Sequence, residues 1–159
     1  MVTHLACSGH RGLPESTTRL VDAALRTELA GRAEPLVGLS CLADGADTLF
    51  ARALLDAGGT LVVVVPAQRY RAGLPRWHHA TYDALWAEAG DVIEVGYVAS
   101  DSRAHMAASQ HMLSLADELV AVWDGQPARG YGGTADVVDA AREQHLPVTV
   151  IWPDGATRD

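Results

Sequence analysis

Hydrophobic residues gather in short runs that alternate with longer segments of mixed character. Each run is of strand length and is bounded by turn-forming residues, which predicts a strand. The run TLVVVVP shows no alternation of polar and apolar positions, so it is expected to be a central strand covered on both faces. The six predicted strands span residues 3–8, 35–40, 60–66, 91–96, 118–123 and 147–152.

Between these runs, apolar residues recur every three or four positions, which is typical of amphipathic helices. The first helix is expected to begin near residues 14–16 and to end at Gly31. Ser100 or Ser102 is expected to cap the fourth helix, because a serine hydroxyl accepts from free amides there. The other predicted helices span residues 43–58, about 78–89, 100–117 and 135–145.

The alternation of strands and helices predicts an α/β fold with three layers, Rossmann-like, around a mostly parallel sheet of about six strands. We expect one domain over residues 1–159 that ends in a polar tail, residues 152–159. In such sheets ligands bind beyond the carboxyl ends of the strands, where the strand order reverses. Loops that follow strands are therefore the first places to look for a site.

The loop after the first strand holds Ser8, Gly9, His10 and Arg11. A glycine lets a ligand approach the backbone, and an arginine offers a planar fork for phosphate. His10 has two interpretations, as a hydrogen-bonding group for phosphate or sugar and as an acid or base. An ordinary surface turn is the alternative interpretation of the whole loop.

The loop after the second strand holds Asp44, Gly45 and Asp47. Asp44 is a candidate helix cap, and Gly45 is expected in the first turn, where free amides can meet a ligand. Both carboxylates would repel a phosphate. We therefore expect them to meet ribose hydroxyls, to orient Arg11 or to cap the helix.

The loop after the fifth strand begins with Asp124 and Gly125 and ends with Gly132, Gly133 and Thr134. These two last glycines directly precede a predicted helix. Their amides, the helix dipole and the threonine hydroxyl would all favour an anion. This stretch is the strongest local signal for a phosphate.

The amino-acid composition excludes several kinds of chemistry and of partner. All 12 basic residues are arginine, and the absence of lysine excludes a Schiff base, a pyridoxal phosphate anchor and a P-loop lysine. The net charge of −8 argues against a nucleic-acid surface, so we expect no nucleic-acid partner. No apolar run is long enough for a membrane helix and no leader opens the chain, so we expect a cytoplasmic protein with no membrane partner.

The remaining candidates for chemistry are few. Cys7 and Cys41 form neither a disulfide framework nor a zinc set, and are expected to be buried thiols, with a redox or nucleophilic role for Cys7 as the alternative. The other histidines lack metal spacing, so no metal site is expected. Tyr70 and Trp77 would either stack on a base or pack. His111 and Met112, on the helix before the fifth strand, are expected to have surface or packing roles, with a position facing the crevice as the alternative.

The segments SGHR, LADGADTLFARALLDAGGTLVVVVP and DELVAVWDG with GGTADVVDAAR resemble the SLOG superfamily over residues 3–152. This Rossmann-like group includes the LOG phosphoribohydrolases, the proteins once labelled lysine decarboxylases and the DprA domain. The chain is most similar to its small stand-alone bacterial branch. The resemblance implies a nucleotide or nucleotide-derived ligand, no required cofactor and a homodimer. It implies these site residues: Ser8, Gly9, His10, Arg11, Asp44, Gly45, Asp47, Pro66, Asp124, Gly125, Gly132, Gly133 and Thr134.

The chain departs from the phosphoribohydrolases where catalysis is concerned. Their PGGxGTxxE motif ends in a catalytic glutamate, and Val137 stands at that position here. Asp136 lies one residue earlier, about 100° away around a helix. The arginine of the preceding helix is also missing, since Arg103 lies too far upstream. We therefore expect a nucleotide-binding sensor or carrier. The alternatives are a nucleoside monophosphate phosphoribohydrolase that uses Asp136 or His10, and an interaction module with a vestigial pocket.

Overall fold

The computed structural model describes residues 1–159 and contains one six-stranded sheet in the order β4-β3-β2-β1-β5-β6. Every neighbouring pair of strands is parallel. The expected α/β class and the parallel six-stranded sheet are confirmed. The strands are β1 (Thr3–Gly9), β2 (Leu36–Ser40), β3 (Thr60–Ala67), β4 (Asp91–Tyr97), β5 (Glu118–Val122) and β6 (Val148–Ile151).

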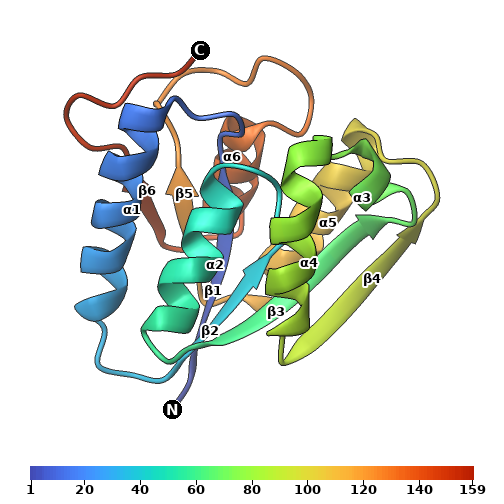
Figure 1. The fold of residues 1–159 in the computed structure, drawn as a ribbon. Helices are drawn as coiled ribbons and strands as arrows, with labels where there is room; N and C mark the ends of the chain where they lie inside the picture. The colour runs from blue at the N-terminus through green and yellow to red at the C-terminus, as the bar shows by residue number, and fades with distance from the viewer.

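Helices cover both faces of the sheet and give the expected three layers. Helices α1, α2 and α4 lie on one face, and α5 and α6 lie on the other (Figure 1). A short helix and a 3-10 turn connect β3 to α4. The helical bounds are α1 (Glu15–Ala30), α2 (Ala46–Asp56), α3 (Tyr70–Gly73), η1 (Arg76–His78), α4 (His79–Ala87), α5 (Ser102–Leu115) and α6 (Thr134–Glu143).

The cap of α5 differs from the sequence prediction. Asp101 is the capping residue, and its carboxylate accepts a hydrogen bond from the Ala104 amide at 3.0 Å. Ser102 is already the first helical residue. The Ser100 hydroxyl pairs instead with Nε2 of His105 at 2.9 Å. A carboxylate one residue before the helix accepts a hydrogen bond from a free amide, and the positive end of the helix dipole stabilises its negative charge.

The core lies where the central strands meet both helical layers. Neighbouring residues of β1 and β5, such as Leu5 and Ala6 or Leu119 and Val120, are completely buried. The same holds for Val63 and Val64 in β3, as the unbroken apolar run predicts. Helix α2 adds Phe50, which is the largest fully buried side chain. The centre of the sheet is thus a rigid base for the loops at its carboxyl edge.

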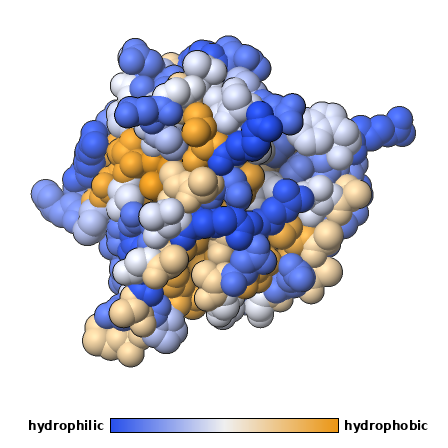
Figure 2. Space-filling model, turned by 60° about the vertical axis from the view of Figure 1, so that its left-hand side comes forward, coloured by the Kyte–Doolittle hydropathy of each residue, from blue (hydrophilic) through white to orange (hydrophobic).

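The surface is mixed in character. Figure 2 shows separate hydrophobic areas that are crossed by hydrophilic side chains. The exposed large hydrophobic residues are spread over several elements and include Leu20 on α1, Trp77 on η1 and Val150 on β6. No helix combines the length and the apolar character that a membrane span requires.

Candidate functional site

The strand order reverses between β1 and β5. The chain moves outward from β1 to β4 and then returns to add β5 and β6 on the other side of β1. A cavity of about 240 Å³ lies at the carboxyl ends of these strands, where the fold class places its ligands. Its lining residues are Cys7, Ser8, Gly9, His10, Arg11, Cys41, Ala43, Asp47, Pro66, Tyr70, His105, Ser109, Met112, Gly132, Gly133, Thr134 and Arg158.

The cavity collects residues from all three predicted loops, so the parallel sheet does bring these loops together. The sequence-predicted residues that line it are Ser8, Gly9, His10, Arg11, Asp47, Pro66, Gly132, Gly133 and Thr134. Asp44, Gly45, Asp124 and Gly125 do not line it. Two of these four contact residues that do line it: Asp44 contacts Arg11, and Asp124 contacts His10.

Asp44 holds Arg11. The Arg11 Nε donates to Asp44 Oδ1 at 2.9 Å, and Nη2 lies 2.8 Å from the same oxygen. The other carboxylate oxygen accepts from the Gly12 amide at 3.1 Å. Asp44 is therefore not the cap of α2, which begins after Gly45 with no side-chain cap. Of the roles expected for Asp44, the structure selects the orientation of Arg11.

His10 is buried and held on two sides. Its Nε2 accepts from the Asp124 amide at 3.0 Å, and its ring meets Trp152 edge-on with centroids 5.6 Å apart. Burial lowers the pKa of His10, the Arg158 charge lowers it further, and Asp124, whose Oδ1 lies 3.1 Å from Nε2, opposes both. On the other side of the ring, Nδ1 lies 3.4 Å from Thr134 Oγ1.

At the start of α6, the backbone amides of the first two helical residues are unpaired, whereas those of the two preceding glycines already donate hydrogen bonds. Gly132 donates its amide to Asp136 Oδ2 at 2.9 Å, and Gly133 donates its amide to the Gly130 carbonyl at 3.2 Å. The amides of Thr134 and Ala135 have no acceptor within the chain. The expected anion donors thus move from the glycines to the first two helical residues.

The structure places Asp136 outside the cavity, since its carboxylate turns back onto Gly132 and closes the loop. Val137 is buried in the core at 1% exposure. Arg103 is exposed on α5 and does not reach the cavity. Of the two catalytic candidates from the sequence, His10 alone lines the cavity.

A buried acidic group forms the floor of the cavity. Asp47 Oδ2 accepts from the Ala43 amide at 3.2 Å, and the Cys7 thiol lies 3.9 Å from Oδ1. Burial raises the pKa of Asp47 to about 7, although the Ala43 hydrogen bond and the Arg11 charge lower it. Burial also raises the pKa of Cys7 and of Cys41, so both thiols are protonated at neutral pH. A protonated thiol is a poor nucleophile, which favours the expected buried thiols over a reactive Cys7.

The part of the cavity near β2, β3 and α5 is lined by apolar and polar side chains, and the polar ones on α5 are His105 and Ser109. Cys41, Pro66 and Met112 line it together with Tyr70, which is buried and meets the His105 ring edge-on at 5.6 Å. Trp77, the other aromatic candidate, is 72% exposed and lies outside the cavity. Of the four candidates from the sequence, Tyr70 and Met112 line the cavity, whereas Trp77 and the exposed His111 do not.

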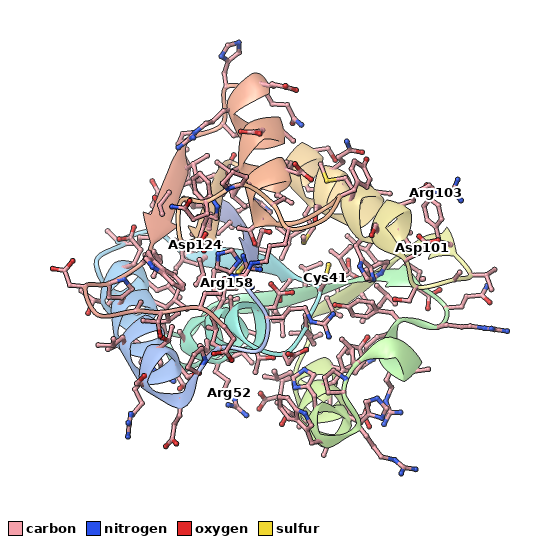
Figure 3. The ribbon with its side chains drawn as sticks, turned by 90° about the horizontal axis from the view of Figure 1, so that it is seen from above. Cys41, Arg52, Asp101, Arg103, Asp124 and Arg158 are labelled. Carbon is pink, nitrogen blue, oxygen red and sulfur yellow. The ribbon has the colours of Figure 1, made fainter.

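Sequence reasoning missed Arg158, His105 and Ser109. His105 and Ser109 lie four residues apart on α5, so they share a face of that helix, but neither belongs to a recognisable motif. Arg158 comes from the segment that was taken for a polar tail. Figure 3 looks down on the carboxyl edge of the sheet and shows Arg158 near the middle, between Asp124 and Cys41.

No protein-family model and no curated protein sequence matches this chain. Solved structures with similar folds do exist. DNA processing protein A (DprA) from Streptococcus pneumoniae gives a TM-score of 0.69 at 18% identity, over 97% of this chain and 52% of that one. This chain therefore spans about half of the pneumococcal protein.

Two further structures share the fold. DprA from Helicobacter pylori, described in its single-stranded DNA binding mode, gives a TM-score of 0.69 at 15% identity, over 98% of this chain and 68% of that one. The molybdenum cofactor binding protein of Rippkaea orientalis gives a TM-score of 0.63 at 12% identity, over 97% of this chain and 78% of that one. At these identities the comparisons show the fold alone, and this is the DprA-like fold that the resemblance implied.

These structures correct one expectation. The net charge led us to expect no nucleic-acid partner, yet a protein with this fold is described in the act of binding single-stranded DNA. Net charge averages over the whole surface, whereas binding depends on the charges at one face. The exclusion of nucleic acid is therefore withdrawn.

Proposed function

We propose that this protein binds a nucleotide or a nucleotide-derived ligand, with its phosphate at the start of α6. The observation that carries the proposal is the cavity at the β1–β5 reversal, which is lined both by the start of α6 and by Pro66, Tyr70 and Met112. A phosphorylated heterocycle has a charged group for the first and a flat ring for the second.

The charged end supplies donors of three kinds. Thr134 lines the cavity and offers a hydroxyl and an amide that has no acceptor within the chain, and the amide of the next helical residue, Ala135, is also unpaired. The arginines Arg11 and Arg158 line the same cavity. The opposite end, with Pro66, Tyr70 and Met112, offers flat and polarizable surface for a heterocycle. Asp47 on the floor supplies hydrogen-bonding oxygens for ring nitrogens.

We propose binding, as in a sensor or carrier, ahead of cleavage. Glycosidic hydrolysis needs a carboxyl group placed at the sugar, as acid, base or nucleophile. The chain has Val137 where the resembling hydrolases have glutamate, and Asp136 is held by Gly132. The one carboxyl group that lines the cavity, Asp47, comes from the first turn of α2 and not from the start of α6, where those hydrolases carry theirs. A fold neighbour described as a molybdenum cofactor binding protein is compatible with a binding role.

Single-stranded DNA is the second candidate ligand, and the observation that favours it is the fold shared with DprA. The same cavity would then receive one nucleotide of a strand. The two candidates differ in what the protein binds more tightly, a free mononucleotide or an oligonucleotide.

Titration calorimetry separates these cases. We expect AMP, GMP, CMP or UMP to bind more tightly than its nucleoside, and more tightly per molecule than a short oligothymidylate. Thr134→Val removes one donor at the phosphate and should weaken the mononucleotide several-fold. Thr27→Val, on the exposed side of α1, is the matched control and should leave the affinity unchanged.

Chromatography of each mixture then tests for a released base. We expect the nucleotide to remain intact. Failure of all four mononucleotides to bind would contradict the proposal, and tight binding of the oligothymidylate alone would favour the DNA candidate. Release of the base would replace the carrier with a hydrolase.

A further inference from the structure

The C-terminal segment, residues 153–159, returns to the site instead of leaving the molecule. It follows β6, turns through a hydrogen bond from the Ala156 amide to the Pro153 carbonyl at 3.0 Å, and runs past the start of α1 at the carboxyl edge of the sheet (Figure 1). Its residues thus lie at the same edge as the loops of the cavity.

Two contacts fix this segment. The Thr17 hydroxyl, completely buried in α1, donates to the Thr157 carbonyl and accepts from the Thr157 amide, both at 2.8 Å. The second contact is at Asp159, two residues after Thr157, where a main-chain oxygen accepts a hydrogen bond from the Arg129 side chain. Arg158 lies between these two contacts, and its side chain lines the cavity.

The Arg158 guanidinium has few partners of its own. It donates no hydrogen bond within the chain, and its one ion pair is a long contact of 3.9 Å from Nη1 to Asp124 Oδ2. The side chain is nevertheless only 22% exposed. Arg11 differs, because Asp44 already occupies its Nε and Nη2. An arginine held in a cavity with its donors unused is suited to an anionic ligand.

Its position fits the charged end of the cavity. Arg158 shares the lining with Gly133 and Thr134, next to the open amides of α6. Its positive charge also lowers the pKa of the nearby His10. In a chain with a net charge of −8, Arg158 is the second arginine that lines this cavity, beside Arg11.

We propose that Arg158 is the arginine that binds the ligand phosphate, and that the C-terminal segment is the arm that positions it. Arg11 is then an oriented wall residue, held by Asp44. This inference rests on the proposed nucleotide site and adds which side chain recognises the phosphate. Thr17 acts through Arg158 and is a positioning residue.

Four proteins test the proposal by calorimetry: wild type, Arg158→Gln, Thr17→Val and the control Arg19→Gln. Arg19 lies on α1 with a side chain 75% exposed, so its loss changes net charge equally without touching the cavity. Each protein is titrated with AMP, GMP, CMP and UMP, with the four nucleosides and with inorganic phosphate.

Arg158→Gln should weaken the mononucleotides roughly ten- to hundredfold, because a charge-assisted hydrogen bond is lost, and should leave any nucleoside affinity within about twofold. Thr17→Val should weaken the mononucleotides in the same selective way but less, since the arm is loosened and the arginine is kept. Arg19→Gln should behave as wild type.

Equal mononucleotide affinity in wild type and Arg158→Gln would overturn the assignment and leave the nucleotide site standing. If no mononucleotide binds wild type but inorganic phosphate binds it and is lost in Arg158→Gln, the anion role stands and the nucleotide function falls. Absence of binding by every phosphate compound overturns both.

Discussion

Asp47 is a carboxylic acid in a buried position. The residue is 9% exposed, it lines the cavity, and burial raises its pKa to about 7. In the unfolded chain an aspartate ionises near pH 4. The neutral carboxyl therefore contributes stability that is complete below about pH 4 and is lost as the pH rises to about 7.

Asp47→Asn, which is neutral at every pH, should gain stability relative to wild type as the pH rises from 4.5 to 8. The expected gain is about 2–4 kcal/mol, since one pKa unit corresponds to about 1.4 kcal/mol. Urea unfolding of both proteins across this range measures it. The exposed Asp139, changed to asparagine, is the control and should show no such trend. A difference that is constant with pH would mean that Asp47 titrates as an ordinary carboxyl.

The sequence identified the candidate residues, but it did not show which hydrogen bonds and ion pairs these residues already make within the chain. The sequence left three roles open for Asp44, and only the structure shows that it holds Arg11, 33 positions away. The Gly132 amide was expected to be free, and Asp136 occupies it. Such pairings depend on side-chain positions that local spacing does not determine.

At the scale of elements, Gly9 shows how the packing of a helix limits a site residue. A Cβ atom at this position would come within 2.4 Å of Ala46 Cβ and 2.8 Å of Val122 Cβ. The sequence suggested that Gly9 lets a ligand approach the backbone. The structure adds that it lets the start of α2 pack against β1 and β5.

Gly9→Ala should therefore lower the free energy of unfolding by about 1–3 kcal/mol, as expected when a methyl group is forced into a packed interior. Gly130→Ala is the matched control, because a Cβ atom there meets nothing within 4 Å. It should stay within about 0.5 kcal/mol of wild type. Thermal or urea unfolding of the three proteins measures this, and equal losses would remove the packing explanation.

The elements themselves were largely predictable. Apolar runs of strand length and apolar residues at helical spacing located all six strands and the five longer helices. The helix Tyr70–Gly73 was missed, since four residues are too few to show a period. The Asp101 cap was missed because three adjacent residues, Ser100 to Ser102, are all good caps.

For the whole molecule, the position of the site followed from the topology. Once the sheet was expected to be parallel, the loops after β1, β2 and β5 had to share an edge, and the cavity lies there. The position of Arg158 in the cavity could not be predicted from the sequence, because it depends on hydrogen bonds between Thr17 and Thr157, which are 140 positions apart. No local pattern encodes a contact of that range.

The central claim is that a nucleotide phosphate binds at the open amides of α6. Nitrogen-proton correlation spectra of the labelled protein, titrated with AMP, GMP, CMP and UMP and with their nucleosides, test it most directly. The account predicts that the Thr134 and Ala135 amide resonances shift with a mononucleotide and not with its nucleoside. Phosphate-dependent shifts that leave these two amides unmoved, or no shifts with any mononucleotide, would contradict it.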